Sequence, residues 1–140
     1  RERIDEIQLL NSEVELKTGE LGYVITYESP DVLSFKFTKY VMIVNGARPN
    51  ITTFGLNFNK NNGAQLDISD VQRIKIDDVK NGVKKHFSAI GVILSDYELN
   101  KVDRVPNRFY FDEQGKLVLI IQSGEMLAPP LGNVEFRVFE

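Results

Sequence analysis

The sequence predicts an α+β fold: a largely antiparallel sheet with one main helix packed on a face and a short N-terminal helix. Most apolar runs alternate with polar residues at the two-residue period of a strand, and turn signals rather than helical crossovers join them. One later stretch, 77–90, instead has the three- and four-residue apolar spacing of an amphipathic helix. Together these patterns favour a sheet that is covered by one helix.

Length and composition indicate one globular domain, 1–140. A chain of 140 residues buries about 70% of its unfolded surface and needs no disulfide or metal to fold. Its 17 Lys and Arg against 20 Asp and Glu give a net charge of −3, which offers no positive field for nucleic acid. The absence of Cys and the single His exclude thiol chemistry, zinc–thiolate sites and a His-rich metal cage. We therefore expect no cofactor, no metal and no nucleic-acid partner.

The segment 1–10 is expected to form a short helix, because Ile4, Ile7 and Leu10 repeat every three residues among charged ones. No capping residue precedes this helix, and the chain begins with Arg1 rather than Met. We expect that the natural N-terminus is not represented. No apolar run approaches the ~20 residues of a membrane helix, so the domain itself should not span a membrane.

Three strands are expected next. The first alternates over 21–27 and ends at the turn signal Ser29-Pro30-Asp31, and the second is long, over 32–44, and leads into the turn 45–50. Along the third strand, we expect the apolar set to point into the core and the asparagines to face away from it. The inward set is Thr52, Phe54, Leu56 and Phe58, and the outward set is Asn57 and Asn59.

The main helix, 77–90, carries acidic residues in its first turn and lysines further on, as the helix macrodipole favours. Gly91 is expected to end it, and Gly82 to weaken its middle by about 1 kcal/mol relative to Ala. A shorter helix is expected to start at Ser69-Asp70. The apolar stripe of the main helix consists of Ile76, Val79, Val83, Phe87 and Ile90.

The C-terminal part returns to strands after a polar passage, 95–107. A hairpin turn at 112–116 precedes the run 117–121, which is apolar on both faces and should be a central strand. The irregular loop 123–132 leads to a last alternating strand over 134–138.

Few residues are candidates for catalysis or metal binding. His86 lies beside the stripe of the main helix, where a boundary or surface position explains it better than a role as general base. The acidic clusters at 67–70 and 77–78 lack the spacing of an EF-hand, and helix capping explains both. Glu125 and Asp112 remain as candidates for a glycoside-cleaving pair of carboxylates.

The turn 45–50 joins two long strands and combines Gly46 with Pro49, which fix its path. It carries Arg48, whose planar guanidinium is a fork of hydrogen-bond donors. The turn is either a shaped connection with a solvated arginine or a recognition loop.

Three stretches, taken in order, resemble one bacterial domain family. Residues 33–50, LSFKFTKYVMIVNGARPN, resemble its long strand and its Gly-Ala-His-Pro-Asn turn. Residues 56–71, LNFNKNNGAQLDISDV, resemble its next strand, Gly turn and Leu-x-Leu-x-Asp helix start. Residues 109–138, FYFDEQGKLVLIIQSGEMLAPPLGNVEFRV, resemble its terminal strands and Glu-bearing loop. This family is the pair of adjoining domains of unknown function found in RsiV-type anti-sigma factors, which sense lysozyme, and beside PdaC-type peptidoglycan deacetylases.

The resemblance implies an extracytoplasmic, non-catalytic domain, either secreted or tethered to the membrane through a part that is not in this chain. It also implies a further N-terminal β segment, which 1–140 lacks. Arg48 stands where the family usually has His, and the terminal loop keeps Glu125 and Gly132 but loses two tyrosines of the family pattern. Any ligand contact that the family makes through that His or those tyrosines is therefore not expected in this chain.

Three functions stay open. The first is a non-catalytic binding or sensing domain of a bacterial cell-envelope protein, with candidate ligand-binding residues Arg48, Asn50 and Glu125. Its partner would be an envelope protein, a lysozyme-like protein or peptidoglycan. The second is a hydrolase of envelope polysaccharide that uses Glu125 or Asp112 as acid, and the third is a structural spacer. A cleft with two converging carboxylates would favour the hydrolase, and an exposed patch the binding domain.

Overall fold

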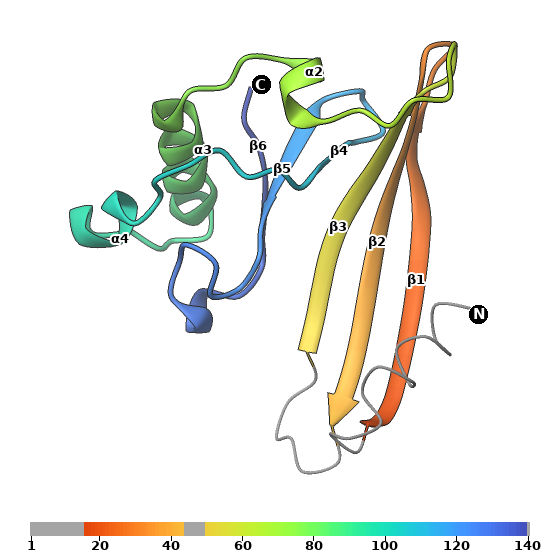
Figure 1. Ribbon diagram of the computed structural model, residues 1–140. Helices are drawn as coiled ribbons and strands as arrows, with labels where there is room; N and C mark the ends of the chain where they lie inside the picture. The colour runs from red at the N-terminus through yellow and green to blue at the C-terminus, as the bar shows by residue number, and fades with distance from the viewer. Residues whose placement is uncertain (1–15, 44–49, 140) are drawn as a thin grey trace.

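The computed structural model describes residues 16–43 and 50–139, and it confirms the α+β class (Figure 1). The expected helix over 1–10 and most of the turn 45–50, Arg48 included, lie outside the described residues. The strands are β1 (Leu16–Glu28), β2 (Val32–Ile43), β3 (Asn50–Asn59), β4 (Phe109–Phe111), β5 (Leu117–Ile121) and β6 (Val134–Arg137). The helices are α2 (Ile68–Val71), α3 (Ile76–Ala89), α4 (Asp96–Asn100) and the 3₁₀ turn η2 (Pro129–Leu131).

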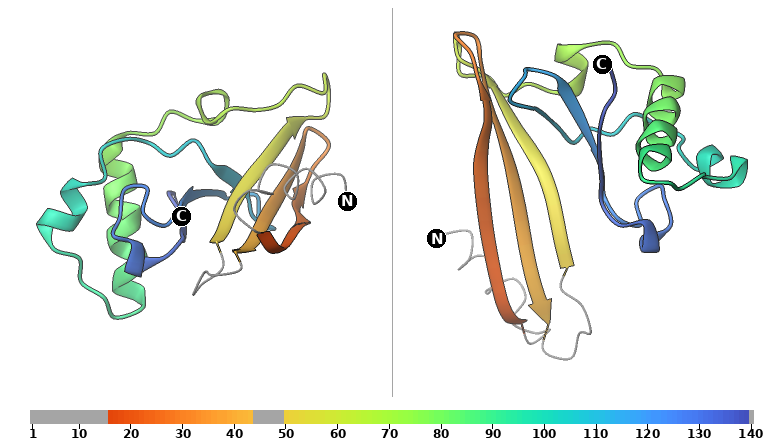
Figure 2. Two further views of the ribbon diagram at one scale, coloured as in Figure 1. Left: turned by 60° about the horizontal axis from the view of Figure 1, so that its bottom comes forward. Right: turned by 180° about the vertical axis from the view of Figure 1, so that it is seen from behind.

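The strands form two separate antiparallel sheets rather than the one sheet that was expected. We call them the long sheet, with order β1-β2-β3, and the short sheet, with order β4-β5-β6. The long strands run well past the short sheet at the end where β1 begins and β2 ends (Figure 1, Figure 2). Among the described residues, no helix is long and apolar enough to cross a membrane.

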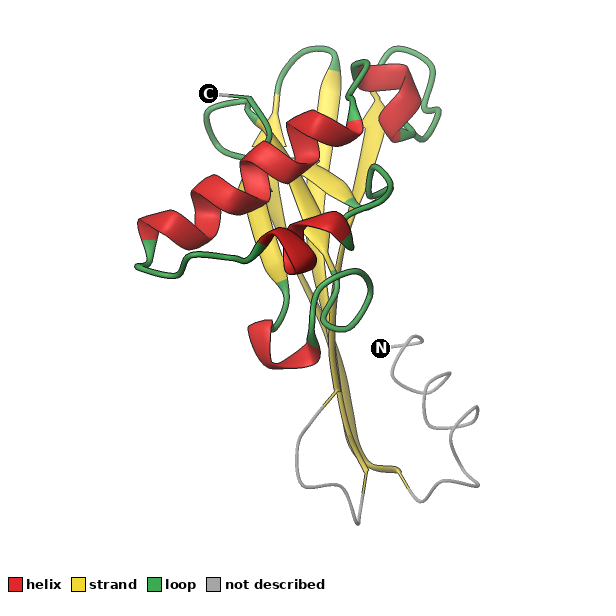
Figure 3. Cartoon of the chain, turned by 90° about the vertical axis from the view of Figure 1, so that its left-hand side faces the viewer, coloured by secondary structure: helices red, strands yellow, loops and turns green. Residues whose placement is uncertain are grey.

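The hydrophobic core lies between α3 and the short sheet. All five residues of β5 are buried, which confirms that this strand is central. Figure 3, which views the molecule from the side of its helices, shows α3 lying across the strands. Every member of the core cluster comes from residues 79–136: Val79, Val83, Phe87, Leu94, Val102, Phe109, Leu117, Leu119, Ile121, Met126, Leu127, Val134 and Phe136.

The main helix is confirmed, although its apolar stripe is shorter than expected. Val79, Val83 and Phe87 are buried, but Ile76 and Ile90 at the two ends are exposed, Ile90 by 64%. The physical reason is that the sheet below is narrower than the helix is long, so only the middle turns meet it. Gly91 has φ 81°, the left-handed conformation that ends a helix.

Gly82 has a packing role that its helix propensity does not reveal. A Cβ at this position would lie 2.5 Å from the ring of Phe136 on β6. The missing side chain therefore lets α3 approach β6 closely.

The expected inward face of the third strand is wrong. Asn57, expected to face away, is only 1% exposed and lies toward the short sheet, whereas Phe54, Leu56 and Phe58 lie on the opposite, half-buried face of the long sheet. The reason is a polar connection between the sheets. Asn57 Nδ2 donates to the carbonyl oxygen of Phe109 (2.9 Å), and Ser34 Oγ donates to Asn57 Oδ1 (2.5 Å). Buried polar groups are tolerated where they are bonded in this way.

The backbones of β3 and β4 also approach each other closely where the two sheets meet. A Cβ on Gly55 of β3 would overlap the carbonyl oxygen of Phe109, so only glycine fits there. The backbone N–H of Phe111 donates to Ser34 Oγ (2.9 Å). The two sheets thus meet through main-chain and small polar groups instead of the apolar packing that alternation predicted.

Two smaller differences concern helices. The short helix begins after Asp67 rather than at Ser69, because Asp67 and Asp70 form a capping box. The polar passage 95–107 contains α4, which Ser95 caps by accepting a hydrogen bond from Glu98 N (3.2 Å). A helix of five residues leaves too little periodicity to be recognised in the sequence.

Candidate functional site

The loop 123–133, which connects β5 to β6, is tied to the start of β3 by two side chains. Gln122 Nε2 donates to the carbonyl oxygen of Ile51 (2.6 Å), and Gln122 Oε1 accepts from Thr53 N (3.1 Å). Asn133 Nδ2 donates to the same carbonyl of Ile51 (3.1 Å). Asn133 Oδ1 accepts from Ser123 N (2.7 Å) and from Gln122 Nε2 (2.9 Å). Both ends of the loop are therefore fixed to the long sheet.

Glu125 is held inside this loop. Its Oε1 accepts hydrogen bonds from Arg108 Nη1 (3.2 Å) and from the backbone N–H of Gln122 (3.0 Å). Its Oε2 lies 3.7 Å from Arg104 Nη2. The carboxylate thus braces the loop against the segment before β4, and it draws two arginines to the surface beside the loop.

Beneath Glu125, the apolar residues Met126 and Leu127 are buried in the core and anchor the loop from below. The exposed Pro129 and Pro130 lie in η2 and restrict the backbone on the outer side. The loop is consequently an irregular but well-supported surface element.

Of the three sequence-predicted ligand residues, the structure places two in one region. Asn50 is the exposed first residue of β3, next to Ile51, and Ile51 is bonded to Gln122, whose backbone N–H binds Glu125. Arg48 lies outside the described residues. We define the loop surface as Asn50, Ile51, the segment 122–133 and the two arginines Arg104 and Arg108.

Sequence reasoning missed four members of this surface: Arg104, Arg108, Gln122 and Asn133. Each is a polar residue in a loop or at the end of a strand, a position that is common on any surface. The weak signal available was that Gln122 and Asn133 flank the loop at the ends of two apolar strands.

Asp112 belongs to a different cluster, at the turn between β4 and β5. Its Oδ1 accepts from the backbone N–H of Lys116 (2.9 Å) and Gln114 (3.0 Å), and its Oδ2 accepts from Arg137 Nε (2.7 Å). Partial burial alone would raise the pKa of Asp112, but these hydrogen bonds and the charge of Arg137 lower it below its ordinary value of 3.8. The carboxyl is therefore held as a carboxylate at neutral pH.

Asp112 and Glu125 lie at opposite ends of β5. Five residues of strand separate the two turns, which corresponds to roughly 15 Å. Carboxylates that cleave a glycoside lie ~5 to 10 Å apart across a cleft. The pair considered in the sequence is not brought together by the fold.

A third polar cluster lies between the sheets. Glu135 Oε1 accepts from Tyr110 Oη (2.7 Å) and forms an ion pair with Lys36 Nζ (2.8 Å). Burial, the hydrogen bond to Glu135 and the charges of Glu135 and Asp112 raise the pKa of Tyr110 well above its ordinary value. The phenol is thus a fixed hydrogen-bond donor at neutral pH.

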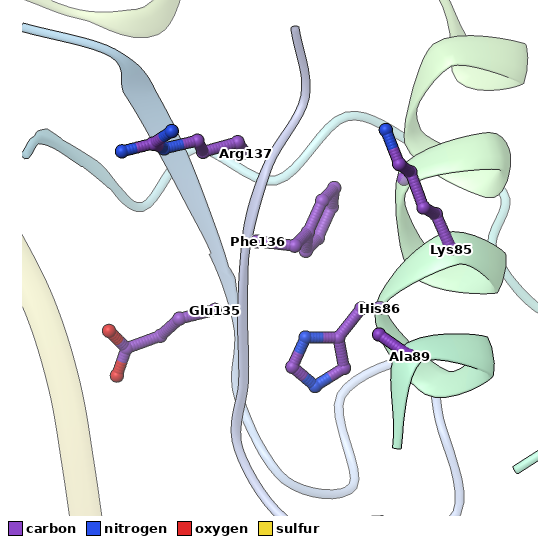
Figure 4. Close-up of a pocket in the computed structure, with 7 residues that line it drawn as sticks. Lys85, His86, Ala89, Glu135, Phe136 and Arg137 are labelled. Carbon is purple, nitrogen blue, oxygen red and sulfur yellow. The ribbon is translucent and has the colours of Figure 1, made fainter. Parts of the chain in front are cut away.

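His86 lines an open groove of about 280 Å³ between α3 and β6. Figure 4 shows that Glu135 and Arg137 extend away from the helix, whereas Lys85 and the imidazole of His86 lie on the groove side. The His86 ring contacts the Phe87 ring edge-on, with centroids 5.1 Å apart. This boundary position agrees with the prediction from the sequence. Over residues 16–43 and 50–139, no three His, Asp or Glu side chains are grouped to hold a metal ion.

Comparisons with known proteins define the fold class. No protein-family model and no curated protein matches the chain. Among solved structures, the chain is similar to a DUF3298 family protein from Pseudomonas aeruginosa PAO1, with 12% identity and a TM-score of 0.72 over 96% of this chain and 63% of that one. It is also similar to a DUF3298 family member from Bacteroides fragilis NCTC 9343, with 13% identity and a TM-score of 0.61 over 98% of this chain and 59% of that one.

At this identity the likeness shows the fold, and the chain spans about 60% of the length of each of these structures. The protein thus has the fold of proteins assigned to a domain family of unknown function, which agrees with the kind of family that the sequence resembled.

Proposed function

We propose that the protein is a non-catalytic binding or sensing domain of a bacterial cell-envelope protein and that it acts outside the cytoplasm. The resemblance of three sequence stretches to envelope-associated domains supports the location. The likeness of the fold to DUF3298 family structures is compatible with it. The partner is an envelope protein, a lysozyme-like protein or peptidoglycan.

The observation that carries the proposal is the construction of the loop surface. Its irregular backbone is fixed by Gln122, Glu125 and Asn133, so that a ligand would meet a preformed surface and cost little conformational entropy on binding. The surface presents polar groups and the guanidinium of Arg104, which is 53% exposed and pairs with the neighbouring Asp103 (3.0 Å). Such groups suit a partner that carries carboxylates or hydroxyls. A loop that served only as a connection could have been far shorter.

The hydrolase alternative has less support. Glu125 is paired with Arg108, which occupies its carboxylate inside the loop. Asp112 is paired with Arg137, and its lowered pKa favours the ionised form, which cannot act as a general acid. Their separation along β5 also exceeds the range of a glycosidase pair. The spacer alternative explains the fold but not the bracing of the loop.

A binding assay with two defined partners tests the proposal. The domain is incubated with purified peptidoglycan sacculi in a co-sedimentation assay and with hen lysozyme in isothermal titration calorimetry. We expect saturable binding to one of them. Asn50→Arg, which places a large side chain on the loop surface, should weaken this binding at least tenfold. Asn100→Arg at the exposed end of α4 is the matched control and should leave it unchanged.

Two results would contradict the proposal. One is the absence of saturable binding to either partner by the folded domain. The other is equal binding by the Asn50→Arg and Asn100→Arg variants, which would place the contact elsewhere. Cleavage of the sacculi, detected as released reducing sugar, would instead favour the hydrolase.

A further inference from the structure

Over residues 16–43 and 50–139, β1 is an edge strand of the long sheet. In the order β1-β2-β3 only β2 pairs with it, and over the described part of the chain no other strand lies along its outer edge (Figure 1). In its middle, Tyr23, Val24 and Ile25 are exposed by 63%, 57% and 56%. Three consecutive exposed apolar residues mean that both faces of the strand are uncovered here.

The devices that usually protect an edge strand are missing from this middle part. Register irregularities occur at Leu16/Thr18 and at Ile25/Tyr27, but the eight residues from 18 to 25 run between them without one. These eight residues contain no Pro and no Lys, and their single charge is Glu20. A regular, weakly charged edge with unpaired backbone groups is a template for a further strand.

A row of aromatic side chains on one face of the long sheet ends at β1. Phe54, Phe37 and Tyr23 lie side by side across the three strands, with ring centroids 5.2 Å and 5.6 Å apart. Cross-strand aromatic pairs of this kind stabilise neighbouring strands. Tyr23 has such a neighbour on one side only, so the row would be extended by an aromatic residue on an added strand.

We propose that the occupant of this edge is β1 of a second copy of the chain, paired antiparallel about a two-fold axis at Tyr23. This register sets Tyr23 opposite Tyr23 of the second copy and continues the aromatic row across the axis. Leu21 then falls opposite Ile25, and Gly22 opposite Val24, so apolar residues meet on the same face. A strand that is complementary to itself favours a symmetric dimer.

The charge pattern is compatible with this occupant, and the small contact area limits its strength. The opposed residues 21–25 carry no charge, and Glu20 falls beyond them, near the irregularity at Ile25/Tyr27 of the second copy, so no like charges oppose each other across the axis. The regular residues that oppose one another are only 21–25 of each copy, about five a side, well below the 20–30 a side of a standard interface. The dimer is therefore weak, with a dissociation constant on the order of 100 µM.

Single cysteines test the register directly, because the chain has no Cys of its own. Opposed residues of an antiparallel pair have Cα atoms ~4.5 to 5.5 Å apart, within the range of a disulfide. Tyr23→Cys should therefore form a disulfide-linked dimer under mild oxidation at 200 µM protein. Tyr97→Cys on α4, which replaces an aromatic residue exposed by 71%, is the matched control and should stay largely monomeric.

Because Tyr23→Cys removes a ring that the dimer would use, a second test keeps Tyr23 and mixes two other cysteine variants. Gly22→Cys and Val24→Cys should cross-link to each other much faster than either does to itself, because they are opposed only in the mixed pair. A Cβ at Gly22 meets no atom within 4 Å, so this substitution does not disturb the fold. Equal cross-linking of Tyr23→Cys and Tyr97→Cys, or of all pairs in the mixture, would overturn the proposal.

Sedimentation equilibrium measures the association itself. The unaltered chain should show a dimer above about 100 µM, and Ile25→Lys, which places a charge on the paired edge, should weaken it at least tenfold. Ile93→Lys in the loop before α4 is the matched control and should leave the dissociation constant unchanged. A chain that stays monomeric up to 1 mM, or a dimer that Ile25→Lys does not weaken, contradicts the proposal.

Discussion

Asp112 shows how one carboxylate couples the stability of the fold to pH. It receives hydrogen bonds from Arg137 and from two backbone N–H groups, which lower its pKa in the folded state. A lowered folded-state pKa stabilises the protein fully above the unfolded-state pKa, and this stabilisation is lost as the pH falls through the folded-state value. Acid should therefore remove the contribution of this side chain.

We expect Asp112→Asn to lower the free energy of unfolding by about 1 to 3 kcal/mol at pH 7, as for a hydrogen-bonded charged group. The difference from the unaltered chain should shrink as the pH falls below about 4. Urea unfolding at a series of pH values measures it. Glu113→Gln, an exposed neighbour, is the control and should show neither effect. A deficit for Asp112→Asn that is constant with pH would show that the charge does not matter.

Asn57 joins the two sheets with a side chain that is almost fully buried. Asn57→Ala removes the donor to Phe109 O and the acceptor for the Ser34 hydroxyl, so the buried Phe109 carbonyl loses this hydrogen bond and the Ser34 hydroxyl, which still accepts from Phe111 N, loses the one it donates. We expect a loss of about 2 kcal/mol or more in chemical denaturation. Asn81→Ala, at an exposed position on α3, should change stability by less than about 0.5 kcal/mol. Similar small losses for both variants would mean that water replaces the Asn57 contacts.

Asn57 also marks the limit of what the sequence could predict at this scale. The alternating pattern correctly divided the residues of β3 between two faces. The apolar face was predicted to point inward, and this was wrong. Which face of β3 points toward the short sheet is decided by contacts with Ser34, Gly55 and Phe109, which lie on three different strands. No local pattern reports such a long-range polar contact.

At the scale of elements, α3 depends on a glycine that its helix propensity disfavours. On an exposed helix, replacing Gly82 by Ala would stabilise the protein by about 1 kcal/mol. Here the new methyl group would meet the Phe136 ring, so we expect Gly82→Ala to lower the melting temperature instead. Phe136→Leu should make room, so Gly82→Ala should cost less in that background than in the unaltered chain. Stabilisation by Gly82→Ala alone would contradict the close approach.

The two ends of the apolar stripe on α3 should differ from its middle. Phe87 is buried against the short sheet, so Phe87→Ala should cost about 3 kcal/mol or more in the free energy of unfolding. Ile90→Ala, at an exposed position, should cost less than about 0.5 kcal/mol. Equal losses at the two positions would show that the helix is covered over its whole length.

Elements with a strong period were predicted well for a physical reason. α3 and β5 repeat their apolar residues often enough to specify a buried face or full burial, and the strands of the long sheet often enough to be recognised as strands. α4 was missed because it has only five residues, and the division into two sheets was missed because strand pairing is a property of distant segments. For the candidate site, the sequence pointed to Glu125 and Asn50, which the fold places in one region, but Gln122 and Asn133, which hold the loop there, carry no distinguishing signal.

For the whole molecule, the position of the core has a consequence for how the chain opens in the native state. The core cluster comes entirely from residues 79–136, and Gln122 and Asn133 bind the long sheet at Ile51, which pairs with Tyr40. Over the described residues, the part of the long sheet beyond this pair is held by cross-strand pairing. Its amide protons should exchange with solvent through local fraying, whereas those of β5 should exchange only through global unfolding. Native-state hydrogen exchange in low urea should separate the two classes: rates in β5 should rise steeply with urea, and rates near Val41 and Met42 should hardly change. The long sheet would then open locally at the end near Val41 and Met42, while its hydrogen bonds near the polar contact with β4 stay protected.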